Sequence, residues 1–294
     1  MKVIIDFINL PRELYVEIRK EDHEKLWQSV SSMSIKEVAE KIGVNVRNLY
    51  KYKEGNSGYP VNVLKRLINL TGITPEVTII KTRRDSESIE CKLPIYLDEN
   101  FAEFLGYILG DGGIDSQLGV HFTTNRIEVL KRFIELVQQI FGNMKFQLKN
   151  YTTRYTVYYP KTLGVLLTQV VGLPRGSKVD SEAAIPDTLL NNFDISMKIK
   201  FIRAFYECDG FSKEIGIGQA GKDLDRPPKI LIQIKTFLED LGFTSVYLKK
   251  STNYLTPKTK KLRSRWVLRI KSKEEKKKFV LLISPLKFKD CVDD

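Results

Sequence analysis

The sequence predicts a mixed α/β (α+β) protein in which a small all-α unit precedes two copies of one α/β unit. Three observations lead to this prediction: capped helical segments near the N-terminus, an internal repeat behind them, and a concentration of basic residues near the C-terminus. A chain of 294 residues is long enough for two or three units of ~100–200 residues. We expect a helical unit at 1–75, a linker at 76–99 and the two copies at 100–190 and 191–294.

Composition excludes several classes of protein. Hydrophobic residues make up 42% of the chain, which is enough apolar surface to exclude a mainly disordered protein. The three cysteines and two histidines are far apart, which argues against a disulfide scaffold and a Cys/His zinc site. No apolar stretch approaches ~18–20 residues and no signal peptide is evident. We therefore expect a cytoplasmic, nucleoid-associated protein.

The chain is strongly basic, and the excess is uneven. Lysine and arginine total 48 against 36 acids, a net charge of +12. Residues 245–290 alone contain 15 basic and three acidic residues. A polyanion is the expected partner, and Tyr254 and Trp266 among these cations favour a nucleic acid. One alternative is that these basic residues form a surface that is only solvated. A weaker alternative is that they bind an anionic membrane.

Two short helices near the N-terminus are joined by a tight turn. Ser34 and Glu37 form a capping box that begins the first helix, and Gly43 ends it. Asn45 can cap a second helix. Its inner face would carry Val46, Leu49 and Tyr52, and its outer face would carry Arg47, Asn48 and Lys51. A third helix contains Val61, Leu64, Leu67 and Ile68. The pattern is that of a helix-turn-helix, whose second helix enters the major groove.

The stretch IKEVAEKIGVNVRNLYKYKEGNSGYPVNVLKRLINLTG resembles phage-repressor-type helix-turn-helix domains, best in its AEKIGV core. The resemblance implies that Arg47, Asn48 and Lys51 contact DNA bases or phosphates. It also allows Val46 to contact a thymine methyl, although that position is usually polar. The alternative is a three-helix bundle used for protein contacts. The following residues, 76–99, combine a β-like run, a polar stretch and Pro94, which is typical of a linker.

An internal repeat follows the linker. The first copy contains FAEFLGYILGDGGI, LGVHFTT, IEVLKRFIELVQQIFG, RYTVYYP and KTLGVLLTQVVGL, and the second contains KIKFIRAFYECDGF, EIGIGQ, PPKILIQIKTFLEDLGF, RWVLRIK and EEKKKFVLLISPLKFK. The Asp-Gly pairs at 111 and 209 are 98 residues apart, and Gly142 and Gly242 are 100 apart. Beyond these glycines, the spacing between corresponding strands of the two copies is no longer constant, which indicates a longer loop around 249–264 in the second copy. The copies are expected to pair about a pseudo-twofold axis.

The helix that opens each copy carries small residues and ends in an acid. Gly106 and Gly110 in the first, and Ala204 and Cys208 in the second, would let two helices pack closely. A carboxylate at a helix C-terminus costs ~0.3–1 kcal/mol. A turn capped by glycine is the simpler explanation for one Asp-Gly pair. Its recurrence in both copies favours a divalent cation site, because Mg²⁺ takes carboxylate oxygens.

FLGYILGDG (Phe104 to Gly112) and IRAFYECDG (Ile202 to Gly210) resemble the paired motifs of LAGLIDADG homing endonucleases. The resemblance implies saddle-shaped antiparallel sheets in the major groove and phosphodiester hydrolysis with Mg²⁺ or Mn²⁺. The metal contacts it implies are Asp111 and Asp209 with Gly110 and Cys208 beside them. Further catalytic candidates are two lysines, Lys178 and Lys289 (with Lys287 as a rival), and two polar residues, Gln219 and Thr124. Each lysine could instead be solvated or contact a phosphate.

Basic strands with interleaved aromatics would contact the duplex: Arg154, Tyr155 and Tyr158 in one copy, and Arg265, Trp266 and Arg269 in the other. Burial in a strand is the alternative for Tyr155 and Tyr158.

Together with these features, the resemblance implies a monomeric, site-specific double-stranded DNA endonuclease of the homing type, with an internal pseudo-dimer. One alternative is a non-cleaving helix-turn-helix regulator, against which the two retained acids argue. Another is an RNA-splicing maturase, and the helix-turn-helix favours DNA over RNA because a helix does not fit the deep major groove of RNA. Whether the gene lies in an intron, in an intein or alone stays open.

Overall fold

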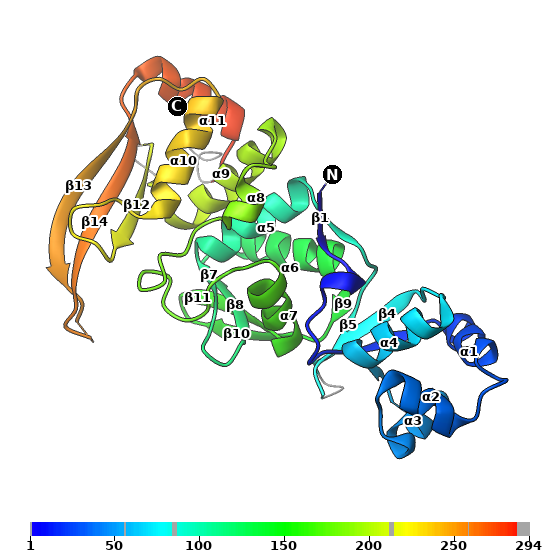
Figure 1. Cartoon of the computed structure of the whole chain (residues 1–294). Helices are drawn as coiled ribbons and strands as arrows, with labels where there is room; N and C mark the ends of the chain where they lie inside the picture. The colour runs from blue at the N-terminus through cyan, green and yellow to red at the C-terminus, as the bar shows by residue number, and fades with distance from the viewer. Residues whose placement is uncertain (1, 56, 84–86, 212–214, 258, 287–294) are drawn as a thin grey trace.

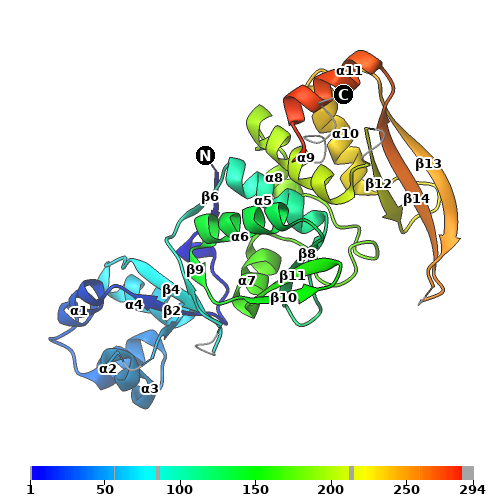
Figure 2. The ribbon, with the colours of Figure 1, turned by 180° about the vertical axis from the view of Figure 1, so that it is seen from behind.

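The structure is a computed structural model that describes residues 2–55, 57–83, 87–211, 215–257 and 259–286. Figures 1 and 2 show an N-terminal unit at one end of the chain, the first repeat in the middle and the second repeat at the other end. The molecule is a mixed α/β structure with antiparallel sheets, as predicted. Within the described residues, no helix is long and apolar enough to cross a bilayer.

The N-terminal helices are α1 (Lys20–Ser29), α2 (Ile35–Ile42), α3 (Val46–Lys53) and α4 (Val61–Thr71). The predicted caps are present. Glu37 N donates to Ser34 Oγ at 3.2 Å, and Ser34 N donates to Glu37 at 2.6 Å. Gly43 ends α2 with a φ of 64°, which a residue with a Cβ rarely adopts. On α3, Leu49 is buried and Arg47, Asn48 and Lys51 are exposed, so the predicted faces are confirmed.

The N-terminal unit also contains strands, so its prediction as all-α is wrong. Strands β2 (Tyr15–Ile18), β3 (Tyr59–Pro60), β4 (Val77–Lys81), β5 (Ile89–Glu90) and β9 (Asn143–Met144) form a sheet in the order β3-β2-β4-β5-β9. Val16 pairs with Ile80, and both are fully buried. The segment predicted as a linker therefore supplies strands to a core, because its apolar residues pair with a strand about 60 residues earlier.

The first residues of the chain reach the repeat region. Strand β1 (Lys2–Ile5) pairs with β6 (Ile95–Leu97), which directly precedes the first repeat. Ile5 and Leu97 are fully buried at this contact. The N-terminal unit and the first repeat are thus joined by strand pairing as well as by the chain.

The first repeat consists of α5 (Glu99–Leu109), β7 (Gly112–Ile114), β8 (Val120–Thr124), α6 (Ile127–Phe141), β10 (Gln147–Tyr151), β11 (Arg154–Tyr159), α7 (Lys161–Val165) and a π-helical turn, η3 (Leu166–Val170). Its sheet has the order β10-β11-β8-β7. The rings of Phe122 on β8 and Phe133 on α6 stack with centroids 4.3 Å apart, so one face of the sheet is covered by helix. The opposite face carries Arg154 and Tyr158, which are both exposed.

The second repeat follows the same order after the short helix α8 (Asp187–Leu190). It comprises α9 (Ile195–Asp209), β12 (Gly216–Gly221), α10 (Lys229–Asp240), β13 (Val246–Leu255), β14 (Leu262–Ile270) and α11 (Lys273–Ile283), with sheet order β12-β14-β13. The loop predicted around 249–264 is wrong in part, since β13 and β14 form a long hairpin there. Most of β13 is exposed, so it lacks the apolar alternation by which a half-buried strand is recognised.

Candidate active site and nucleic-acid interface

The centre of the repeat region is the close contact between α5 and α9. A Cβ atom on Gly106 would lie 2.6 Å from the carbonyl oxygen of Phe201 and 2.8 Å from the Cβ of Ala204. A Cβ on Gly110 would lie 2.5 Å from the Cβ of Cys208. The predicted packing through small residues is confirmed, because only glycine leaves room for the second helix. The C-terminal ends of both helices therefore meet.

Each of these helices delivers one aspartate to that meeting point. Asp111 lies two residues beyond the end of α5 and is exposed, whereas Asp209 is the last residue of α9 and is half-buried. Burial raises the pKa of the Cys208 thiol, and the charges of Asp111 and Asp209 raise it further. Both carboxylates thus lie within electrostatic range of one side chain in the helix contact. The predicted convergence of the two acids is consistent with this arrangement.

A lysine, Lys178, lies within electrostatic range of both acids. The Lys178 ammonium donates hydrogen bonds to the carbonyls of Gly110 and of Leu109, the latter at 3.1 Å. Its loop is held against β7 by a hydrogen bond of 2.7 Å from Gly176 N to the Ile114 carbonyl. Burial lowers the pKa of Lys178, and the charges of Asp209 and Asp111 oppose this effect. The ammonium therefore caps the negative end of α5 and offsets the repulsion between the carboxylates.

Removal of this ammonium tests its part in the site. On the expectation of phosphodiester hydrolysis drawn from the sequence, Lys178→Met should reduce DNA cleavage by about 10²–10³-fold, because a cation positioned at developing phosphate charge is lost. Lys178→Arg keeps the charge and should retain part of the rate. Lys222→Met is the matched control, since the exposed Lys222 lines the same small pocket. Single-turnover cleavage measures all three variants, and equal rates for Lys178→Met and wild type would exclude a catalytic part.

The remaining catalytic candidates are placed differently. Gln219 on β12 lines, together with Lys178, a pocket of about 30 Å³. Thr124 lies on the face of β8 that carries Phe122, and its Oγ1 accepts a hydrogen bond of 3.2 Å from Arg126 N. The structure therefore places Gln219 beside Lys178 and turns Thr124 towards the helix-covered face. Lys289 and its rival Lys287 lie outside the described residues.

His121 is a residue near the site that the sequence motifs do not single out. It pairs with Gly113 across β7 and β8, and its ring lies where a Cβ of Gly113 would come within 3.0 Å. Burial lowers the pKa of His121, Lys178 lowers it further, and Asp115 raises it. In the sequence, His121 is of interest only as a possible ligand of a Cys/His zinc site, which the wide spacing of these residues argues against. Alternation along β8 could have indicated it, because Phe122 is buried on one face of the strand and His121 is only half-buried on the other.

The residues at the meeting point suit a hard divalent cation. Mg²⁺ is commonly held by one or two carboxylates, with water and substrate phosphates completing its shell. Asp111 and Asp209 supply such carboxylates. Among the residues that the structure describes, no group of three or more His, Cys, Asp or Glu could hold a metal. The raised pKa keeps Cys208 a neutral thiol, so a contact from Cys208 would come from its backbone, and the Gly110 carbonyl is bound to Lys178.

The open face of the first sheet is basic and aromatic. Tyr158 pairs with His121 on this face, and the Lys149 ammonium lies 5.1 Å from the Tyr158 ring centroid. Arg154 lies at the same distance, 5.1 Å, from the ring centroid of Tyr151. Tyr155 lies on the opposite face, packed against the core. Of the two tyrosines singled out in the sequence, one is thus available to a ligand and one is structural.

The second sheet presents arginines over a strand of small residues. On the face of β14 that carries Arg265 and Arg269, the paired residues of β12 are Gly216, Gly218 and Ala220. A Cβ on Gly216 would lie 3.2 Å from Cγ of Arg269, so the arginine lies across β12. Trp266 is on the other face, half-buried, with its Nε1 donating to Ser264 Oγ at 3.0 Å. Trp266 is therefore a packing residue of this sheet.

Asp180 links the long hairpin to the loop that carries Lys178. Its carboxylate accepts from Arg263 and from Lys261, the latter at 3.3 Å. The hydrogen bond from Arg263 is the main reason that the pKa of Asp180 falls to about 2, with smaller effects of Ser177 and Lys261. The hairpin of β13 and β14 is thereby fastened beside the acid pair.

This link predicts an acid-dependent loss of stability. The pKa of Asp180 is lower in the folded chain than its ordinary value of 3.8, so the link stabilises the fold above about pH 4 and is lost as pH falls towards about 2. Asp180→Asn should therefore lower the free energy of unfolding at about pH 5 and have a much smaller effect near pH 2, where the carboxyl is partly protonated even in the folded chain. Denaturant titrations at both pH values measure this. An equal difference between the variant and wild type at both values would contradict the assignment.

Comparisons with known proteins give partial and distant similarities. No family model matches the chain. The replication factor C small subunit of Methanocaldococcus jannaschii is 31% identical over 115 residues, which are 38% of this chain and 6% of that protein. The glutamine–fructose-6-phosphate aminotransferase (isomerizing) of the same organism is 23% identical over 229 residues, 72% of this chain and 20% of that protein. The chain thus spans only a small part of the length of these relatives.

Solved structures are similar over most of the chain. The homing endonuclease I-DmoI, in complex with DNA and Mn, has 21% identity and a TM-score of 0.42, covering 63% of this chain and 96% of that chain. The N-terminal LAGLIDADG domain of DUF199/WhiA has 14% identity and a TM-score of 0.39, covering 65% of this chain and 86% of that chain.

Proposed function

We propose that the protein is a metal-dependent, site-specific endonuclease of double-stranded DNA. The observation that carries the proposal is the convergence of Asp111 and Asp209, one from each repeat, on Lys178 at the ends of two tightly packed helices. A bound Mg²⁺ or Mn²⁺ would activate water for attack on the phosphodiester and stabilise the leaving oxygen. The two acids, one per repeat, match the two strands of a duplex.

The surrounding residues support chemistry on DNA. Lys178 is a half-buried cation beside the acids, where it can stabilise the negative charge that develops on the phosphate. Gln219, in the same small pocket, can orient a water or a phosphate oxygen. The basic faces that carry Arg154 and Arg265 can hold the phosphate backbone on either side. Their many cations position the duplex, and base contacts need come from only a few side chains.

Cleavage of a library of duplexes tests the proposal. The full chain is incubated with randomised duplex DNA and Mg²⁺, and the new ends are sequenced. We expect a limited set of recurrent ends, with chelation of the metal abolishing them. Ends distributed at random, or no ends in Mg²⁺ and in Mn²⁺, would contradict a site-specific nuclease.

We propose that α3, as the second helix of a helix-turn-helix, enlarges the DNA contact. Arg47 is exposed on α3, and its loss should remove about one phosphate or base contact. We expect Arg47→Ala to weaken duplex binding by ~1–3 kcal/mol, or to reduce the slope of log K against log salt by about 1. Lys36→Ala on the neighbouring helix α2 is the matched control. A wild-type affinity that does not change with salt would exclude the basic surfaces as the DNA contact.

A non-cleaving DNA-binding protein is the second candidate, and one observation favours it. The Lys178 ammonium lies within electrostatic range of both acids and binds the Gly110 carbonyl, so it offsets carboxylate repulsion without a metal. Specific binding of duplex DNA with no cleavage in either Mg²⁺ or Mn²⁺ would establish this candidate in place of the first.

A further inference from the structure

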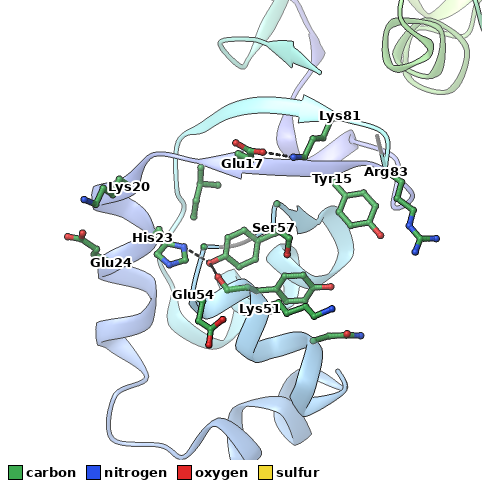
Figure 3. A pocket seen from close by; sticks show the side chains of 16 residues that line it. Tyr15, Glu17, Lys20, His23, Glu24, Lys51, Glu54, Ser57, Lys81 and Arg83 are labelled. Carbon is green, nitrogen blue, oxygen red and sulfur yellow. Dashed lines mark hydrogen bonds and ion pairs between the residues drawn. The ribbon is translucent and has the colours of Figure 1, made fainter. Parts of the chain in front are cut away.

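A large pocket lies in the N-terminal unit, away from the acid pair. Figure 3 shows it between helices α1 and α3 and the strands β2 and β4. Its volume is about 850 Å³, which falls within the ~300–1,000 Å³ of small-molecule sites. Polar and aromatic side chains from all these elements line it, among them Tyr15, Asn48, Lys51, Tyr52, Glu54 and Arg83.

The floor of the pocket is a closed hydrogen-bond network. The buried Tyr59 hydroxyl accepts from Trp27 Nε1 at 2.9 Å and lies 2.7 Å from His23 Nδ1. His23 Nε2 donates to the Lys53 carbonyl at 3.0 Å, since a carbonyl can only accept. The Tyr59 hydroxyl also lies 3.3 Å from the Tyr52 carbonyl. Every polar atom of this floor is thereby paired. The floor is a preorganised surface with no need of a ligand to complete it.

The two ends of the pocket differ in charge. In Figure 3, Tyr15, Lys51 and Arg83 lie at one end, and Lys20, His23 and Glu24 lie at the other. In the strand wall, the carboxylate of Glu17 is paired with Lys81 at 2.5 Å. One end of the pocket therefore has two cations and a phenol. The other end has the carboxylate of Glu24 beside Lys20 and His23. A ligand matched to this pocket has an anionic part and a part that donates hydrogen bonds.

The wall beside the cationic end is aromatic. The rings of Tyr52 and Tyr59 have centroids 5.7 Å apart and planes inclined by 34°. Burial raises the pKa of Tyr52, and the nearby Tyr15 phenol raises it further, so the two phenols are neighbours. Asn48 on α3 adds an amide, which can both donate and accept. Flat aromatic surface, an amide and two cations thus occur together.

We propose that this pocket binds one nucleotide. Lys51 and Arg83 would hold its phosphate, and the base would lie against Tyr15 and Tyr52. Aromatic side chains bind any base through its π-face, and an amide or carboxylate can bind the donor groups of a base edge. A phosphate or a polyphosphate alone would leave the aromatic wall unused and would face Glu24 and Glu54.

The nucleotide can come from two sources, which share this chemistry. One is a free mononucleotide. The other is a nucleotide turned out of a duplex bound by α3, since Asn48 and Lys51 belong both to the pocket and to the predicted DNA-contacting face. The second source rests on the proposed DNA binding, and the first does not.

Calorimetric titration of the full chain tests the free source. The probes are the four deoxynucleoside monophosphates, with inorganic phosphate as the anion control. We expect the mononucleotides to bind more tightly than phosphate, and Lys51→Ala and Tyr15→Ala each to weaken them about tenfold. Lys36→Ala and Tyr50→Ala are matched controls, because both residues are exposed and neither lines the pocket. Circular dichroism verifies that each variant is folded.

Fluorescence of 2-aminopurine tests the duplex source. The base is placed at successive positions of a duplex that the chain binds, and a change in emission at one position, altered in Tyr15→Ala, is the expected result. Nucleotide binding without duplex binding would retain the pocket and reject the DNA-binding proposal. Duplex binding with no mononucleotide bound and no change in emission would overturn the pocket proposal alone. Phosphate bound as tightly as the nucleotides, with Tyr15→Ala unaffected, would reduce the pocket to an anion site and also overturn it.

Discussion

Asp111→Asn and Asp209→Asn are each expected to lower DNA cleavage by about 10³-fold or more while leaving duplex binding in Ca²⁺ nearly unchanged. Asparagine has the shape of aspartate and lacks the charge that holds a cation. The basic faces of the two sheets do not depend on either acid, so affinity should persist. Single-turnover cleavage in Mg²⁺ and filter binding in Ca²⁺ separate the two properties.

The two acids need not contribute equally to each strand. Because one acid comes from each repeat, a variant that still nicks one strand would assign that strand to the remaining half of the site. Asp115→Asn is a matched control, since Asp115 lies on the turn after β7 and bonds to Gln117 N and Gly119 N within that turn. Wild-type cleavage by both Asp111→Asn and Asp209→Asn would remove the basis of the nuclease proposal.

Gly106→Ala is expected to be the most destabilising small substitution in the repeats. Its Cβ would lie 2.6 Å from the backbone oxygen of Phe201, and backbone cannot move aside as a flexible side chain can. Overpacking of this kind costs ~1–3 kcal/mol, which corresponds to roughly 2–4 °C in Tm per kcal/mol for a chain of this size. Thermal unfolding of both proteins measures the difference. Gly106→Ala should also reduce cleavage, because the pair of helices α5 and α9 positions both acids.

A double variant distinguishes this packing from a local helix effect. Ala204→Gly removes the atom that lies 2.8 Å from the added Cβ, so Gly106→Ala combined with Ala204→Gly should recover part of the lost stability. Recovery should be incomplete, since the Phe201 carbonyl remains. Unchanged unfolding of Gly106→Ala would mean that α5 and α9 are further apart than the structure has them.

Local signals in the sequence predicted the local parts of the fold. The caps at Ser34 and Asn45 involve residues two or three apart, and such interactions are independent of the rest of the chain. The contact of Gly106 with Ala204 followed from small residues at helical spacing in two repeated segments. Repetition supplied the pairing that a single helix could not have indicated.

Pairings between distant segments were not predictable in the same way. The Val16 to Ile80 pairing joins a strand in the helical unit to the segment expected to be a linker, and nothing in either segment specifies its partner. The nucleotide pocket brings together Tyr15, Lys51 and Arg83 from three separated segments. His121 approaches Lys178 only because β7 and β8 fold back on each other. Such sites depend on register, which one sequence does not reveal.

Anomalous diffraction from crystals of the chain bound to duplex DNA and Mn²⁺ would locate the metal at the proposed site. We expect manganese peaks ~2.0–2.2 Å from carboxylate oxygens of both Asp111 and Asp209, beside a phosphodiester of the bound duplex. Manganese peaks that touch neither carboxylate, or a duplex bound away from the ends of α5 and α9, would refute the assignment of the two acids as the metal site of a nuclease.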